Sequence, residues 1–124
     1  MVRYSIKYWK ALKMAINRKK LIDLFIGNIS NAILHKILEK AVEDDIVRRY
    51  YDKEFTNSFE IAKKYREKIN PLDNELPESS EIKNAIIKKV TNELKIRISK
   101  GYKNIDLSLV EPTANKILSD LKVN

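Results

Sequence analysis

Apolar residues recur with helical spacing along the first twenty residues, so at about 100° per residue they share one face of a helix. That face holds Tyr4, Tyr8, Leu12, Ala15 and Ile16. The opposite face is basic and holds Arg3, Lys7, Lys10 and Lys13. The pattern predicts an amphipathic first helix that continues over 21–26 and stops at Gly27 and Asn28.

Two further helices are predicted before the middle of the chain. One starts at Asn28 or Ser30 and continues toward Tyr50, and its apolar stripe holds Ile33, Leu34, Ile37, Leu38 and Ala41. The next starts at Asn57, because Glu60 follows at capping-box spacing. Its buried face is expected to hold Ile61, Tyr65 and Ile69, and it ends at Asn70–Pro71 because a residue before proline avoids helical geometry.

Residues 71–80 carry two prolines and two serines and are typical of a linker. Beyond the linker, Ser79 or Ser80 caps a helix that extends to Ile98, with Ile82, Ile86, Val90 and Leu94 on its apolar stripe. Gly101 is expected to end this helix in left-handed conformation. Ile105 and Leu107 suggest a short extended segment, and a last helix covers about Glu111 to Leu121, with Pro112 in its first turn.

These patterns predict an all-α fold. We expect one domain over 1–124, an irregular bundle of four or five helices in two halves joined by the linker 71–80. A chain of 124 residues that is 44% hydrophobic is long and apolar enough to bury a core. Only two glycines and three prolines are present, too few for the many tight turns of an all-β fold.

Charge is unevenly distributed along the chain. Residues 1–20 have no acidic side chain and carry seven basic residues, almost all of the net charge of +8. These residues are Arg3, Lys7, Lys10, Lys13, Arg18, Lys19 and Lys20. A second basic stretch, 83–103, contains Glu93 as its only acid, and the region between the two stretches is acidic. Because concentrated charge typically faces a partner, we predict that the seven N-terminal residues bind one.

Most site chemistry is absent from the sequence. The chain has no cysteine, which excludes disulfides, zinc–thiolate sites and iron–sulfur ligation. His35 is the only histidine, and with Gly27 and Gly101 as the only glycines there is no phosphate-binding loop. We therefore expect no catalytic residue, no cofactor and no metal. The longest apolar run, Leu21–Ile29, is interrupted and short, so we expect no transmembrane segment and a cytoplasmic location.

Three alternatives have some support in the sequence. Glu39 and Glu43 stand one helical turn apart and could share Mg²⁺ in a small hydrolase. Gly27 could be the turn of a helix-turn-helix, although Asp23 and Lys36 then occupy positions where the two helices must touch. The basic helices 1–20 and 83–103 could bind nucleic acid, with Tyr4, Tyr8 and Trp9 stacking on bases.

Two segments carry a resemblance to a known family. The opening VRYSIKYWKALKMAINRKKLIDLFIG and the later LSLVEPTANKILSDL, together with the chain length and helical pattern, resemble the M subunit of the archaeal energy-converting nickel–iron hydrogenase A complex. The resemblance implies a small cofactor-free subunit on the cytoplasmic side of a membrane-bound, ferredoxin-linked hydrogenase. It implies no functional residues.

Together these observations favour a non-catalytic helical accessory subunit of a larger assembly. The expected partner is a protein or a membrane-bound complex, to which the chain would be peripheral. A nucleic acid is the main alternative partner, and a second copy of the chain would form a homodimer.

Overall fold

The computed structural model describes residues 6–123 and, for side chains, residues 17–123. It confirms the all-α prediction: the described part contains four α-helices and a 3₁₀ turn and no strand. The helices are α1 (Ile6–Ala41), α2 (Asp45–Glu67), α3 (Ser79–Ser99) and α4 (Val110–Ser119), with η1 (Leu107–Leu109) before α4.

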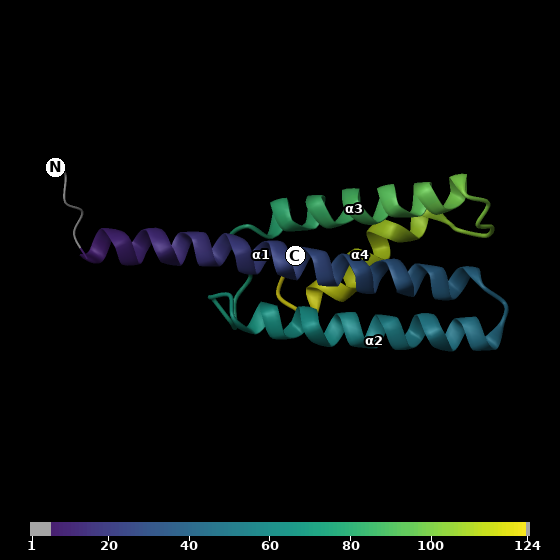
Figure 1. Ribbon diagram of the computed structural model, residues 1–124, viewed down its shortest axis with the longest axis horizontal. Coiled ribbons are helices and arrows are strands. Elements are labelled where there is room, and N and C mark those ends of the chain that lie inside the picture. Colours follow the sequence, from purple (N-terminus) through teal and green to yellow (C-terminus); the bar gives the residue numbers. More distant parts are fainter. Residues whose placement is uncertain (1–5, 124) are drawn as a thin grey trace.

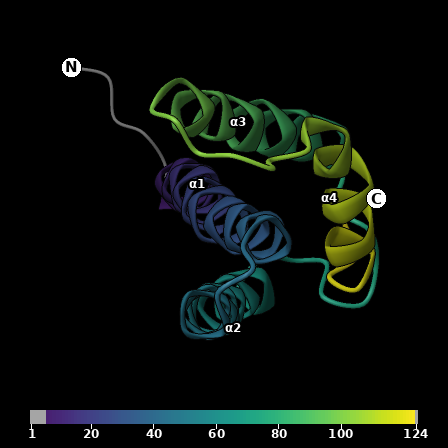
Figure 2. The ribbon, with the colours of Figure 1, turned by 90° about the vertical axis from the view of Figure 1, so that its right-hand side faces the viewer.

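Helix α1 is the axis of the molecule (Figure 1). Helices α2 and α3 lie on two sides of it, and α4 lies near a third side (Figure 2), so one face of α1 faces away from α4. Helix α2 returns antiparallel to α1, and α3 runs in the same direction as α1. The N-terminal part of α1 extends well past the ends of α2 and α3.

The predicted stop at Gly27 is wrong, because α1 is continuous from Ile6 to Ala41. A glycine within a helix costs only about 1 kcal/mol. Phe25, Ile29 and Ile33 flank it at helical spacing and are completely buried. Because burying each such side chain stabilises the fold by about 1.5–3 kcal/mol, packing outweighs the local preference of the glycine. The predicted stripe is confirmed at Ile33, Leu34, Ile37 and Leu38, which are all buried.

The first break in the chain comes at residues 42–44 instead. Asp44 caps α2, because its Oδ1 accepts hydrogen bonds from the backbone N–H groups of Ile46 at 2.8 Å and Val47 at 3.0 Å. The Arg48 guanidinium donates to the carbonyl of Val42 at 3.0 Å, which ties the turn back to the end of α1.

Helix α2 is unbroken from Asp45 to Glu67, so the predicted helix start at Asn57 is also wrong. Small buried residues, Ser58 and Ala62, lie on the side of α2 that packs against α1. Phe55 and Phe59 stack beside them with ring centroids 5.7 Å apart. Ile61, expected in the core, is 45% exposed, because the buried positions of α2 are Ser58, Ala62 and Arg66 and Ile61 lies one position before this stripe.

The linker occupies residues 68–78, slightly earlier than predicted. Ser79 is the first residue of α3, and its hydroxyl donates to the Leu76 carbonyl at 2.7 Å. The cap position belongs to Glu78, whose carboxylate makes no cap hydrogen bond, so the predicted serine cap is wrong.

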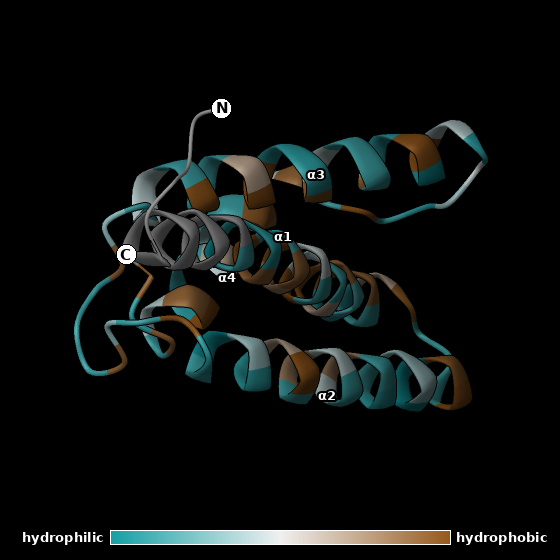
Figure 3. Ribbon diagram, turned by 60° about the vertical axis from the view of Figure 1, so that its left-hand side comes forward, coloured by the Kyte–Doolittle hydropathy of each residue, from teal (hydrophilic) through white to brown (hydrophobic). Residues whose placement is uncertain are grey.

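The C-terminal half follows the sequence prediction closely. Ile82, Ile86, Val90 and Leu94 form the buried stripe of α3, and hydrophobic positions recur along this helix in Figure 3. Gly101 has a φ of +98°, as expected for a left-handed helix terminus. The expected extended segment at 105–107 is wrong, because Leu107 begins the 3₁₀ turn that leads into α4.

Candidate binding surfaces

The structure places the seven predicted partner-binding residues in three situations. Arg3 lies outside the described residues, as do the side chains of Lys7, Lys10 and Lys13, whose backbone is part of α1. Lys19 and Lys20 are exposed on α1. Arg18, in contrast, is held within the molecule.

Arg18 forms a bidentate ion pair with Glu78 at the start of α3. Its Nε lies 2.7 Å from Oε2 and its NH2 lies 2.8 Å from Oε1, while NH1 donates to the carbonyl of Asn70. The hydrogen bonds from Arg18 hold the pKa of the Glu78 carboxyl below its usual value and raise the pKa of Arg18. Arg18 therefore marks the point where α1 joins the bundle, and its charge is already engaged.

A groove lies beside this ion pair, between α1 and the first turns of α3. Its volume is about 490 Å³. The side chains of Ile22, Ile26, Ile82 and Ala85 make it largely apolar, and Arg18, Lys19, Asp23, Glu78 and Glu81 line it with charge. The groove includes Arg18 and Lys19, so it lies next to the point where the projecting part of α1 leaves the bundle.

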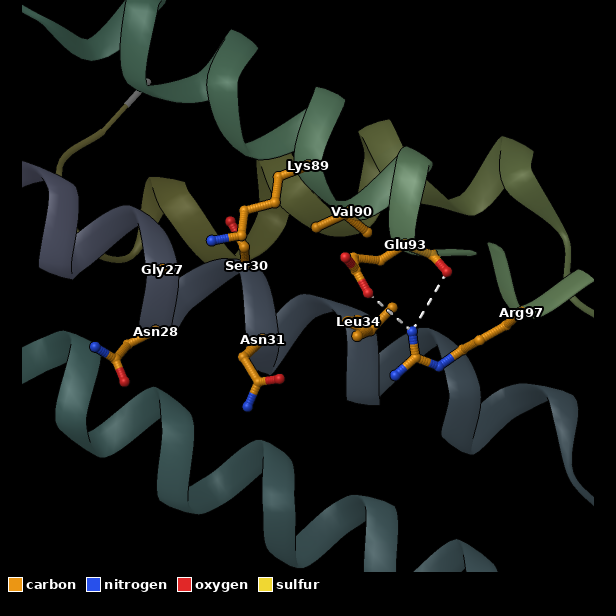
Figure 4. A pocket seen from close by; sticks show the side chains of 9 residues that line it. All are labelled: Gly27, Asn28, Ser30, Asn31, Leu34, Lys89, Val90, Glu93 and Arg97. Carbon is orange, nitrogen blue, oxygen red and sulfur yellow. Dashed lines mark hydrogen bonds and ion pairs between the residues drawn. The ribbon is translucent and has the colours of Figure 1, made fainter. Parts of the chain in front are cut away.

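A second pocket, of about 330 Å³, lies between the middle of α1 and α3 (Figure 4). Its lining residues are Gly27, Asn28, Ser30, Asn31, Leu34, Lys89, Val90, Glu93 and Arg97. The lining is mostly polar, although α1 and α3 meet through apolar stripes elsewhere. In Figure 4 helix α4 lies behind the pocket, so the pocket opens on the face of α1 that α4 does not cover.

Most of the polar groups around this pocket have partners. Arg97 NH1 lies 3.2 Å from a carboxylate oxygen of Glu93, one helical turn earlier. The Asn31 amide donates to the Ser58 hydroxyl at 2.7 Å, and the Asn28 amide donates to the Leu24 carbonyl at 2.8 Å. The exceptions are the Lys89 ammonium, which has no ion pair among the described side chains, and the buried Ser30 hydroxyl.

Aromatic side chains continue this face toward the other end of the bundle. His35 donates from Nδ1 to the Asn31 carbonyl at 2.7 Å, and its ring lies 5.8 Å from that of Tyr51. Burial and the neighbouring phenol of Tyr102 raise the pKa of Tyr51, while the positive charge of Arg97 opposes the rise. Sequence reasoning missed this face, because its members come from three elements and share no periodicity.

The structure does not assemble the predicted magnesium pair. Glu43 lies beyond the end of α1, so it is not one turn from Glu39 on a helix. The carboxylate of Glu39 lies 3.4 Å from the Lys36 ammonium. Among the described residues, no group of three or more acidic, histidine or cysteine side chains could hold a metal. A helix-turn-helix at Gly27 is excluded because α1 passes through that position without a turn.

One helical segment meets the criteria of length and composition for a membrane span. This segment is Asn17–Ala41, and 44% of its most apolar window is buried inside the bundle. The core helix of a water-soluble bundle meets the same criterion, because it must be apolar on several faces. Its apolar character is therefore weak evidence for a membrane span.

Comparison with known proteins identifies no relative: no family model, no curated protein and no solved structure matches the chain.

Proposed function

We propose that the protein is a non-catalytic accessory subunit that joins a larger assembly through the N-terminal part of α1. The observation that carries this proposal is the projection of that helix beyond the ends of α2 and α3 (Figure 1). Among the side chains that the structure describes (17–123), the first charged contact of α1 with the linker and α3 is at Arg18, with Asn70 and Glu78.

A projecting helix of this length needs an additional source of stability. The segment extends a helix that is already formed, so it pays no nucleation cost, but most helical stability in proteins comes from packing of an apolar face against the rest of the fold. The sequence places Tyr8, Leu12 and Ile16 at helical spacing in this segment. A partner that covers this apolar face would stabilise the helix, and the adjoining groove at Ile22 and Ile26 would extend the covered surface.

The charge of the segment selects the kind of partner. Its basic residues favour an acidic protein surface, and basic amphipathic helices also suit the anionic surface of a membrane-bound complex. The resemblance to a hydrogenase M subunit makes the cytoplasmic side of a membrane-bound hydrogenase our specific proposal for the assembly. No step of the reaction is assigned to this chain.

The test compares charge reversal at two places on the same protein. The first variant replaces Lys7, Lys10 and Lys13 with Glu. The control replaces the exposed residues Lys88, Lys95 and Lys103, on α3 and just after it, with Glu, which changes the net charge equally. Each tagged protein is expressed in its native cell, and the size of its complex is measured by native electrophoresis and gel filtration.

We expect the wild type and the control to migrate in a large complex, and the N-terminal variant to migrate near its own mass of 14.5 kDa. Equal loss in both variants would contradict the proposal, as would a monomeric wild type. Nucleic-acid binding is tested separately with a random-sequence oligonucleotide in about 0.15 M salt. Sub-micromolar affinity that falls steeply with salt would favour the nucleic-acid alternative instead.

A further inference from the structure

The pocket between α1 and α3 contains a buried hydroxyl that lacks a hydrogen-bond partner. Ser30 is 3% exposed, and its Oγ makes no hydrogen bond to any described residue. A serine within a helix usually satisfies its hydroxyl on a backbone carbonyl of the preceding turn. Because an unpaired buried polar group is destabilising, a hydroxyl of this kind in a pocket wall indicates a ligand that supplies the missing bond.

The pocket also has an unbalanced positive charge. The Lys89 Nζ lies 3.9 Å from the point that a β-carbon on residue 27 would occupy, so the ammonium lies over the bare backbone of Gly27 (Figure 4). Glu93 and Arg97 form an ion pair with each other. The Lys89 ammonium, on an exposed residue, is therefore left without a counterion among the described residues, and the pocket favours an anion.

The size and the remaining hydrogen-bonding groups narrow the class of ligand further. A volume of about 330 Å³ is at the small end of the range for ligand pockets. Lys89 offers three N–H donors, and Ser30 offers a hydroxyl that can donate or accept. In Figure 4 the Asn28 and Asn31 side chains point toward α2, where Asn31 donates to Ser58, so the polar groups left for a ligand are those of Lys89 and Ser30.

We propose that this pocket binds a small organic oxyanion that carries hydroxyl groups, with the anionic group on Lys89 and a hydroxyl on Ser30. A phosphate monoester and a hydroxycarboxylate share this chemistry. The site goes beyond the proposed function and is independent of it, because its residues belong to the packed part of α1 and to α3, not to the projecting helix.

The experiment measures binding to the full-length protein by backbone NMR at constant ionic strength. The probes are glycerol 3-phosphate for the phosphate source, glycerate for the carboxylate source and glycerol as the neutral control. We expect saturable shifts at residues 27–31 and 89–93 with at least one anionic probe. No saturable shift with either anion, or equal affinity for glycerol, would overturn the proposal.

Two neighbouring lysines provide a matched pair of variants. Lys89→Gln should weaken binding about tenfold or more, because a hydrogen bond to a charged group is lost. Lys88 is exposed, as Lys89 is, but it does not line the pocket, so Lys88→Gln removes the same charge and should change the affinity less than about twofold. Similar effects from the two variants would mean non-specific charge attraction and would contradict the site.

Two buried serines provide a second pair that separates binding from folding. Ser30→Ala removes an unpaired hydroxyl, so we expect it to raise the Tm of the free protein while it weakens binding. Ser58→Ala removes the acceptor of the Asn31 amide, so it should lower the Tm. If Ser30→Ala lowers the Tm as Ser58→Ala does, or leaves affinity unchanged, the hydroxyl is structural and the proposal fails.

Discussion

Two arginines hold the same linker in different ways. Arg66 is 4% exposed and has no acidic partner among the described residues. Its guanidinium instead donates hydrogen bonds to four backbone carbonyls, those of Leu121 at 2.6 Å, Ile69 at 2.8 Å, and Pro71 and Asn74 at 3.0 Å. Arg18 is about one third exposed and pairs with the Glu78 carboxylate and the Asn70 carbonyl. Arg66 also ties the linker to the C-terminal end of the chain.

The comparison shows how exposure to solvent determines the contribution of a charged side chain to stability. Burial lowers the pKa of Arg66, and the nearby positive charge of Arg18 lowers it further, but a guanidinium stays protonated in proteins. Arg66 is thus a buried cation whose desolvation cost is offset by its hydrogen bonds to backbone carbonyls. These carbonyls in turn need hydrogen-bond donors. Water already solvates much of Arg18 and Glu78, so their pairing adds less.

The largest effect is expected from Arg66→Met. The substitution leaves four carbonyl groups without their donor, and breaking a buried charge network typically costs about 3–5 kcal/mol. We expect the free energy of unfolding, measured by urea denaturation with circular dichroism, to fall by about 3 kcal/mol or more. Arg49→Met, at an exposed position of the same helix, is the control and should change it by less than about 0.5 kcal/mol.

Arg66→Lys keeps the positive charge but removes the planar guanidinium. It therefore separates the effect of the charge from the effect of the hydrogen-bonding geometry. An ammonium is a compact point charge with three donors and cannot span the four carbonyls as a planar guanidinium does. We expect this variant to lose most of the stability that Arg66→Met loses, measured in the same way. Near wild-type stability would mean that the charge alone holds the linker.

A smaller effect is expected at the surface ion pair. Arg18→Gln should lower the free energy of unfolding by about 1 kcal/mol or less, because exposed pairs are partly screened by water. A cost as large as that of Arg66→Met would remove the contrast between the two sites. The measurement is urea denaturation at pH 7 for both variants in the same buffer.

The surface pair also makes stability depend on pH. The pKa of Glu78 is lowered in the folded state relative to about 4.5 in the unfolded chain. Its contribution is therefore complete above that pH and is lost as the pH falls through the lower folded-state pKa. The stability difference between wild type and Glu78→Gln should accordingly shrink as the pH falls from about 5 to about 3. An ordinary glutamate carboxyl becomes protonated over this range. A difference that stays constant over this range would contradict the pairing.

The smallest effect separates the two members of the pair. Glu78→Gln leaves the Arg18 cation without its carboxylate near Arg66 and also removes a negative charge from the N-terminus of α3, where it is favourable. Arg18→Gln instead removes a like charge from Arg66. We expect Glu78→Gln to cost about 0.5 kcal/mol more than Arg18→Gln, in urea denaturation at low salt. A reversed order would contradict this account.

Periodicity by itself determined the helical class and much of the core. The stripe Ile82, Ile86, Val90 and Leu94 is buried as its spacing predicts, and Gly101 and Pro112 lie where their backbone preferences place them. These features are local, because 3.6-residue spacing and backbone sterics act within a few residues. The same reasoning failed at Gly27 and Asn57, where weak local signals competed with long-range burial.

The candidate sites depended on the tertiary structure more than the helical class and the core did. The sequence marks the basic N-terminal residues by charge alone, but it cannot show that Arg18 is engaged by Glu78, sixty positions away. It gives no sign that Ser30 and Lys89 line one pocket, because each is unremarkable on its own helix. Nor does it distinguish Arg66 from the exposed basic residues that surround it on α2.

The physical reason is the range of the forces involved. Hydrophobic periodicity states which face of a helix must be buried, and that requirement is present in the chain itself. The partner that covers the face, and the polar groups that are consequently removed from water, follow from how the helices pack. Tertiary packing therefore decided which arginine became a buried clamp, which remained at the surface and where a serine hydroxyl lost its partner.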